Sequence, residues 1–172
     1  METREFLGSV PFFAEVLSGA ELDALAAGTR YVEFDQGSNL IRERDIGDSM
    51  YVIAQGTVAV SIHDSGKDRS VATLRAGDLV GEMSLLTGAP RAATVTAQAP
   101  VVALEIGRSA IEPLLTAEPA LFDRFAAMLE KRQIELDKLY GAGLWLFHGP
   151  PRANLATVIR TYFAGLPNRK LS

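Results

Sequence analysis

One glutamate and one arginine stand out in the stretch "GDLVGEMSLLTGAPRAATVTA", which covers residues 77–97. Glu82 and Arg91 are nine positions apart, and most of their neighbours are Gly, Ala, Leu and Val. A carboxylate and a guanidinium in such surroundings need partners, because burying an unpaired charge is costly. Either the two form an ion pair with each other, or a ligand supplies the partner that each lacks.

The residues around this pair favour an anionic ligand. Gly81 opens a short helical turn after a strand, and a helix start offers unpaired backbone N–H groups. Pro90 fixes the chain just before Arg91, and Ala92 follows with little side chain to cover its amide. Amides and one guanidinium suit a phosphate, whereas an ionised Glu82 only accepts hydrogen bonds and so suits ribose hydroxyls. The stretch as a whole therefore predicts a site for a small nucleotide.

The elements that position this stretch are short strands. Between Arg30 and Ile106, turn segments such as "DQGS", "DSGK" and "RAGD" recur with a spacing of ~8 to 12 residues, which is typical of a sandwich, barrel or jelly roll. The runs between them are rich in β-branched residues; they are "MYVIA", "VAVSI", "VATL", "ATVTA" and "VVALEI". Before them, a capping box with Ser18 as the cap and Glu21 reaching back predicts a helix to about Ala27.

A helical pattern follows the strands and has an arginine in its apolar stripe. The period begins at about Pro119 and continues to 140. Its apolar positions are Phe122, Phe125, Leu129, Leu136 and Leu139, and the position missing from the stripe is Arg132. Three interpretations are open. The Arg132 head group reaches water over its alkyl stem, it sets the register of a helix dimer, or it faces a polar group bound beneath the helix.

Composition argues against several classes of function. The net charge of −4 gives no general attraction to nucleic acid. The chain has no cysteine, so disulfides and thiolate metal sites are excluded, and its two histidines form no metal-binding motif. No apolar run approaches the roughly 18 residues of a membrane span, and the start "METREFLGSV" does not read as a signal peptide. We therefore expect a cytoplasmic protein without a metal or a nucleic-acid partner.

The last 32 residues differ from the rest in charge. Residues 1–140 contain all 21 acidic residues and 13 basic ones, whereas 141–172 contain four basic residues and no acid. This shift, together with Gly141 and Gly143, predicts a boundary between a body and a tail. We expect one helix around 153–164, capped by Asn154, whose apolar face includes Leu155, Val158, Ile159 and Tyr162. That face either packs on the body or docks onto another subunit or an anionic partner.

The run "GEMSLLTGAPRAATV" resembles the phosphate-binding cassette of cyclic nucleotide-binding domains. That family includes catabolite-activator-type regulators, regulatory subunits of cyclic-nucleotide-dependent kinases and cyclic-nucleotide-gated channels. The run "VEFDQGSNLIRERDIGDSMYVIAQGTVAV" resembles the family's first strands, and "LFDRFAAMLEKRQ" resembles its lid helix. The chain looks closest to the sensor domain of bacterial channels. One departure is Val80, where the family usually has an aromatic residue, and we expect this to change packing more than binding.

The resemblance implies a fold and a set of site residues. The fold is α+β, a β jelly-roll barrel over residues 1–140 with N-terminal helices and a C-terminal lid helix. Arg91 would hold the cyclic phosphate with the amides of Ser84 and Ala92, and Glu82 would bind the ribose 2′-hydroxyl. The residues implied to contact the ligand are Gly81, Glu82, Met83, Ser84, Arg91 and Ala92. Val71 and Ala72 would line the pocket for the nucleobase, and Arg132 would lie over the purine. The ligand would be cAMP rather than cGMP, because members that favour guanine have a threonine at the position of Ala92.

Four functions compete at this point. The first is a regulatory sensor, in which a ligand that touches both barrel and lid favours the closed lid. A gene regulator would need a helix-turn-helix module after the lid helix, and an enzyme on such a barrel would need metal ligands or a nucleophile motif, which the sequence lacks. A domain that has lost its ligand is disfavoured by the intact Glu82 and Arg91. We expect a sensor and not an enzyme: the cytoplasmic domain of a bacterial ion channel, or a free-standing sensor, as a monomer or an oligomer.

Overall fold

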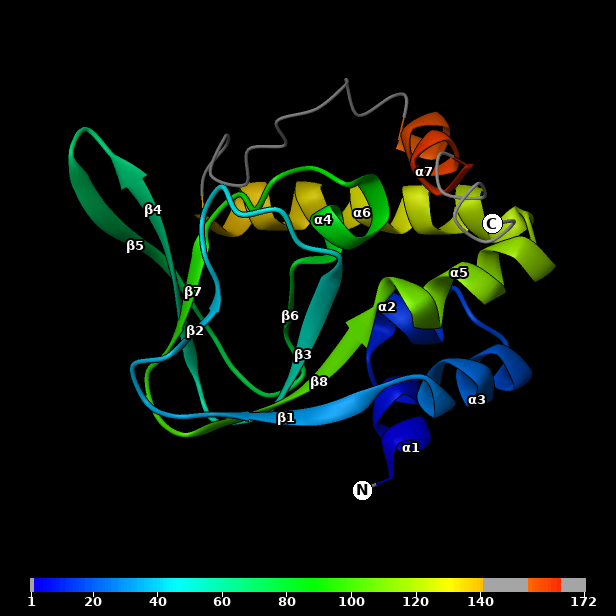
Figure 1. Cartoon of the computed structure of the whole chain (residues 1–172), viewed down its shortest axis with the longest axis horizontal. Helices are drawn as coiled ribbons and strands as arrows, with labels where there is room; N and C mark the ends of the chain where they lie inside the picture. The colour runs from blue at the N-terminus through cyan, green and yellow to red at the C-terminus, as the bar shows by residue number, and fades with distance from the viewer. Residues whose placement is uncertain (1, 141–154, 165–172) are drawn as a thin grey trace.

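The computed structural model describes residues 2–140 and 155–164, which form two antiparallel sheets with helices packed at one end (Figure 1). The helices are α1 (Thr3–Gly8), α2 (Pro11–Ala14), α3 (Gly19–Ala27), α4 (Glu82–Thr87), α5 (Arg108–Ala117), α6 (Ala120–Tyr140) and α7 (Leu155–Ala164). The strands are β1 (Arg30–Phe34), β2 (Asn39–Ile41), β3 (Ser49–Gln55), β4 (Val58–Asp64), β5 (Lys67–Leu74), β6 (Leu79–Val80), β7 (Thr94–Ala97) and β8 (Val101–Gly107).

The strands form two four-stranded sheets that share an apolar core. The first sheet has the order β1-β8-β3-β6 and the second the order β2-β7-β4-β5. Ile53 and Ala103 of the first sheet and Val60 and Val95 of the second belong to one buried cluster. The five runs rich in β-branched residues lie in β3, β4, β5, β7 and β8. The predicted α+β fold, a jelly-roll barrel flanked by helices, is confirmed.

A second core joins the first sheet to the helices. It contains Leu25 of α3, Leu104 of β8, Leu85 of α4 and Phe125 of α6. The predicted capping box is present at the start of α3, because Ser18 Oγ accepts from the Glu21 N–H at 3.3 Å and the Ser18 N–H donates to Glu21 Oε1 at 2.8 Å. This core is what fixes the helices at one end of the barrel.

The long helix α6 follows the predicted stripe along most of its length. Phe125, Leu129 and Leu136 are buried, as expected from their spacing. Leu139, however, is 72% exposed, so its assignment to the buried stripe was wrong. The reason is that Leu136 is the last residue of α6 that lines the pocket under this helix, and Leu139 lies one turn beyond it. Within the described part of the chain, no helix has the length and apolar character needed to cross a membrane.

The helix expected in the tail is α7, and it packs on the body. Leu155, Ile159 and Phe163 are buried in the same core as α4, α5 and α6. This is the first of the two arrangements considered for its apolar face. The boundary near Gly141, the Asn154 cap and the tail's single tryptophan lie outside the described residues, and the division of the chain at 140 stays a prediction.

Candidate functional site

Glu82 and Arg91 line the same pocket but have different partners. Both side chains belong to buried residues, 8% and 6% exposed, and the pocket lies between α4, the second sheet and α6. Glu82 is the first residue of α4, and Arg91 follows in the segment that leads to β7. Among the described residues no ion pair joins the two, so the partner of each must be sought elsewhere.

Arg91 is a buried cation whose hydrogen bonds, among the described residues, all go to uncharged acceptors. Nη1 donates to the carbonyls of Ser49 at 2.7 Å and Gly81 at 3.3 Å, and Nη2 donates to Ser49 Oγ at 3.3 Å. Burial lowers the pKa of the Arg91 guanidinium, while the Tyr51 hydroxyl and the Asp48 carboxyl act in the opposite direction. An anion bound here would give the guanidinium the charge-assisted hydrogen bonds that these neutral groups do not supply.

Two glycines leave room for this guanidinium. A Cβ atom at Gly81 would lie 2.7 Å from Arg91 Nη1, and one at Gly47 would lie 2.5 Å from Arg91 Nη2. Gly81 also has a φ of 86°, a conformation that glycine adopts without steric cost. The Arg91 head group therefore lies between two segments of backbone that could carry no side chain without displacing it.

The loop between β2 and β3 is bonded to the backbone of Arg91 on both sides. The Arg91 N–H donates to the Asp45 carbonyl at 2.9 Å, and the Arg44 N–H donates to the Arg91 carbonyl at 2.8 Å. Since Gly47 belongs to the same loop, these two bonds also place Gly47 beside the guanidinium. The loop thus holds Arg91 through its main chain, and the side chain remains directed at Ser49 and the pocket.

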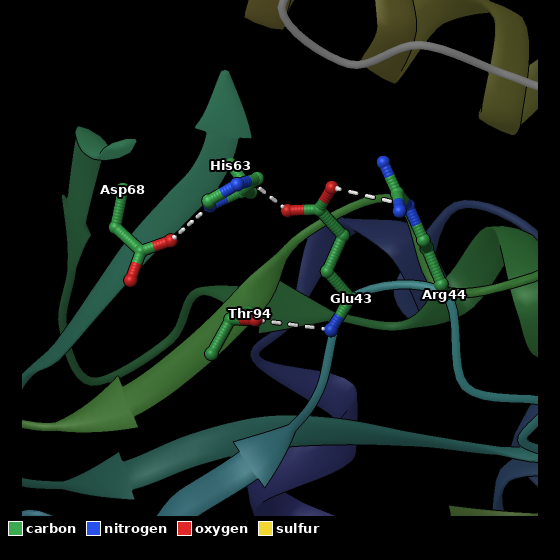
Figure 2. Close-up of polar contacts among 5 residues, drawn as sticks. All are labelled: Glu43, Arg44, His63, Asp68 and Thr94. Atoms are coloured by element: carbon green, nitrogen blue, oxygen red, sulfur yellow. Dashed lines mark hydrogen bonds and ion pairs between the residues drawn. The ribbon is translucent and has the colours of Figure 1, made fainter. Parts of the chain in front are cut away.

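A polar cluster anchors this loop to the second sheet (Figure 2). Glu43 Oε1 accepts from the His63 N–H at 2.8 Å, and the Glu43 N–H donates to Thr94 Oγ1 at 3.0 Å. The His63 ring in turn contacts Asp68, with 2.9 Å between Nδ1 and Oδ1. Glu43 therefore ties the loop to β4 and β7 at once, which fixes the segment that carries Asp45 and Gly47.

Glu82 is held by the arginine of the long helix. Arg132 Nε donates to Glu82 Oε1, and Arg132 Nη2 donates to the Leu79 carbonyl. The Arg132 head group faces a polar group beneath the helix, which does not by itself decide among the three interpretations. That group is the protein's own carboxylate, so the role of Arg132 over a purine stays a prediction.

The other residues expected at the phosphate and the ribose surround the same pocket. Gly81, Met83, Ser84 and Ala92 all line it. The Leu85 N–H donates to the Gly81 carbonyl at 3.1 Å, so helix geometry leaves the earlier N–H groups of α4, including that of Ser84, without a partner inside the helix. Backbone donors and the Arg91 guanidinium are thus available on one side of the pocket.

Much of the remaining lining of the pocket is apolar, and sequence reasoning identified it incompletely. The space measures about 680 Å³, part of it open to solvent. Its apolar lining includes Ile41, Val95, Leu129 and Leu136. Val71 and Ala72, which were expected to contact the nucleobase, lie on β5 and pack in the core between the sheets. They are not among the residues that line the pocket, so their contact with a ligand stays a prediction. The period of α6 marked Leu129 and Leu136 as buried, but nothing in the sequence marked Ile41.

This arrangement has a definite chemical capacity. The buried guanidinium and the amides of α4 can bind one anionic group, and the Glu82 carboxylate can accept from a hydroxyl a short distance away. The apolar wall can cover a flat ring system. A molecule with these three parts in sequence is a nucleotide, and the fit requires no metal and no nucleophile.

Comparison with known proteins gives the same answer at the level of the family. Residues 31–118 match the family model described as "Cyclic nucleotide-binding domain". A cGMP-dependent protein kinase of Toxoplasma gondii is 34% identical over 166 residues, which are 95% of this chain and 15% of that kinase. The chain spans well under two thirds of the curated relatives that it matches, for instance 11% of a cGMP-dependent protein kinase of Eimeria tenella.

Solved structures of the same kind superpose on the fold. A cyclic nucleotide-binding domain from Methylobacillus flagellatus is 26% identical, with a TM-score of 0.66 over 80% of this chain and 80% of that one. The regulatory domain of Toxoplasma gondii PKA, solved with cAMP, is 28% identical with a TM-score of 0.61, over 72% of this chain and 48% of that one.

Proposed function

Because the chain belongs to the cyclic nucleotide-binding domain family, we propose that the pocket at Arg91 binds a cyclic purine nucleotide and that α6 is its lid. The observation that carries this proposal is the buried Arg91 guanidinium, which has only uncharged hydrogen-bond acceptors among the described residues. The cyclic phosphate supplies the missing anion. The chain then acts as a regulatory binding domain and not as a catalyst.

Each part of the nucleotide has a candidate partner in the pocket. Arg91 holds the phosphate together with the amides of Ser84 and Ala92, and Glu82 accepts from the ribose 2′-hydroxyl. The purine lies against the apolar wall, where Leu129 and Leu136 of α6 meet the barrel. A nucleotide that touches both barrel and α6 binds the closed arrangement more tightly, and so shifts the population of α6 toward that arrangement.

A side-by-side calorimetric titration with cAMP and cGMP tests the proposal. We expect saturable binding of one nucleotide per chain, with cAMP bound more tightly. AMP, which lacks the cyclic diester, is the matched control and should bind much more weakly. Absence of heat with both cyclic nucleotides, in a protein shown to be folded, would contradict the proposed function.

The preference for cAMP is attributed to Ala92. This residue lines the pocket next to Arg91 and has no hydroxyl group. In the family, a threonine at this position favours guanine through a hydrogen bond to its exocyclic amine. Without that bond, the pocket has no group at Ala92 that selects guanine over adenine.

We predict that Ala92→Thr increases the affinity for cGMP. One added neutral hydrogen bond is worth ~0.5–1.5 kcal/mol, which corresponds to a gain of about 2- to 13-fold. Ala92→Val is the matched control, because valine has the shape of threonine without the hydroxyl. Titrations of both variants with both nucleotides check the result. An equal gain in the valine variant would attribute the effect to shape, and equal binding of cAMP and cGMP by the unmodified protein would remove the basis of the argument.

The output of the sensor is proposed from its relatives. Two of the proteins described above are cGMP-dependent protein kinases and a third is the regulatory domain of a PKA, so we favour a kinase catalytic domain or subunit as the partner, in the cytoplasm. The transmembrane domain of an ion channel, expected from the resemblance to bacterial channel sensor domains, remains the alternative together with a free-standing sensor. The reading frame of the parent gene distinguishes these three cases directly.

A further inference from the structure

Helix α7 bridges the two elements that carry the nucleotide site. Its buried residues Leu155, Ile159 and Phe163 belong to the same apolar core as Leu85 of α4 and Phe125 of α6. Figure 1 shows α7 beside the first half of α6 and above α5. Arg160 of α7 also donates to both carboxylate oxygens of Asp123 on α6, at 3.3 and 3.2 Å. A segment that lies outside the pocket is thus attached both to the helix that begins with Glu82 and to the proposed lid.

Helix α7 contacts α4 at a glycine, where no side chain separates the two helices. Gly88 ends α4 with a φ of 77°, and a Cβ atom there would lie 2.5 Å from the ring of Tyr162. The Tyr162 ring therefore packs directly on the carboxyl end of α4. Because α4 has only six residues, about 9 Å of helix separates this contact from Glu82 at the other end. A short helix moves as one body, so a displacement at Gly88 also displaces Glu82 and the amide of Ser84.

A buried arginine holds the Tyr162 ring in place. The Arg108 guanidinium carbon lies 4.3 Å from the ring centroids of both Tyr162 and Phe163. Arg108 Nη2 donates to the Tyr162 carbonyl at 3.3 Å, and Arg108 Nε donates to Glu112 at 3.0 Å. These contacts orient the two aromatic rings of α7 and direct Tyr162 at Gly88.

The same arginine also opposes the docking of α7. Arg108 is only 9% exposed, and its Nη1 is buried with no hydrogen-bond partner among the described residues. Such an unsatisfied donor regains its hydrogen bonds in water when the surrounding helix moves away. The apolar and aromatic contacts that favour docking are therefore partly offset, and the position of α7 can respond to a change at α4 or α6.

From these contacts we infer that Tyr162 is a positioning residue for the nucleotide site. By packing on Gly88, it keeps α4 in the place where Glu82 and Ser84 meet the same ligand as Arg91. The inference rests on the proposed function. Since coupling between two sites is reciprocal, a bound nucleotide must in turn hold α7 more firmly in its docked position.

The first test compares the nucleotide affinity of three variants of the full chain. Tyr162→Ala removes the ring, Tyr162→Phe retains it, and Thr161→Ala alters an exposed neighbour on α7. We expect Tyr162→Ala to bind cAMP on the order of tenfold more weakly, within the usual range of coupling between sites. Tyr162→Phe and Thr161→Ala should stay within about twofold of the unmodified protein. A purely structural Tyr162 would lower the stability of the protein and leave the cAMP affinity of the folded molecules unchanged.

The second test measures amide hydrogen exchange in α7 with and without cAMP. We expect cAMP to slow exchange at residues 155–164 of the unmodified protein, and to have no such effect in Arg91→Ala. Two outcomes overturn the inference: exchange in α7 that is unaffected by saturating cAMP, or faster exchange in Tyr162→Ala with an unchanged cAMP affinity. In both of these outcomes the unmodified protein still binds cAMP, so the proposed function stands. Failure of the unmodified protein to bind any cyclic nucleotide is a different result, which overturns the proposed function and this inference with it.

Discussion

Replacing Arg91 by alanine is expected to lower the affinity for cyclic nucleotide by about 30- to 5,000-fold, which corresponds to about 2–5 kcal/mol for the loss of one partner from a desolvated charge pair. The phosphate would enter a pocket from which the guanidinium beside Gly81 and Gly47 had been removed. The amides of α4 would remain, but they do not carry a full charge. Calorimetric titration with cAMP measures the loss directly.

Two further variants make this prediction specific. Arg91→Lys keeps the charge but should restore little, because the single nitrogen of an ammonium group cannot reproduce the planar fork with which a guanidinium bonds the Ser49 carbonyl and a phosphate through separate nitrogens. Arg75→Ala removes an exposed arginine and should bind as the unmodified protein does. Arg91 also donates hydrogen bonds to Ser49 and Gly81. Thermal unfolding of Arg91→Ala therefore checks that the lower affinity does not result from an unfolded protein. Near-normal affinity in a folded Arg91→Ala protein would end the assignment of the phosphate site.

The second large effect is expected at Glu82. Glu82→Gln keeps an acceptor but removes the charge, and a hydrogen bond to a charged acceptor is worth about 1.5–3 kcal/mol, or about 13- to 160-fold in affinity. The loss should be smaller than that of Arg91→Ala. Glu82 also accepts a hydrogen bond from Arg132, so the substitution is expected to destabilise the protein before nucleotide binds as well as the complex. The measured change in affinity is the difference between these two destabilisations.

A cycle with 2′-deoxy-cAMP removes that ambiguity. The unmodified protein and Glu82→Gln are each titrated with cAMP and with the 2′-deoxy nucleotide. The change in the free protein is common to both nucleotides and cancels in the comparison. We expect the unmodified protein to bind the deoxy nucleotide more weakly than cAMP, by a factor similar to the effect of Glu82→Gln. In the Glu82→Gln variant, removal of the 2′-hydroxyl should lower the affinity only a little further. If the two changes were fully additive, Glu82 would not contact the ribose.

The parts of this site that the sequence predicts are those that are local in the chain. Gly81, Glu82 and Arg91 lie within eleven positions of one another, so one short segment brings its own glycine, carboxylate and guanidinium into the pocket. The capping box of Ser18 and Glu21 is predictable for the same reason. The strands are predictable because alternation and β-branched residues mark each of them independently of its neighbours.

The parts that the sequence does not predict depend on contacts between distant segments. Ile41 reaches the pocket because β2 pairs with β7, and no pattern near Ile41 reports that pairing. The stripe of α6 identifies its apolar positions but not where the underlying pocket ends, which is why Leu139 was misassigned. The partner of Arg132 is a carboxylate fifty residues earlier, and the contact of Tyr162 with Gly88 joins the tail to the centre of the chain.

We expect the ion pair between Arg132 and Glu82 also to limit how fast a nucleotide enters the proposed site. In the structure α6 lies over the pocket, and Arg132 donates to Oε1 of the carboxylate that the ribose is proposed to use. A ribose hydroxyl that takes the place of Arg132 at Oε1 displaces this pair, so we expect nucleotide association at the proposed site to wait for α6 to open. The observed association rate should then rise with nucleotide concentration only until it reaches the opening rate of the lid, and stay constant above it. A nucleotide already bound must leave through the same opening, so the strength of one arginine contact sets both the delay before a signal begins and the time for which it lasts.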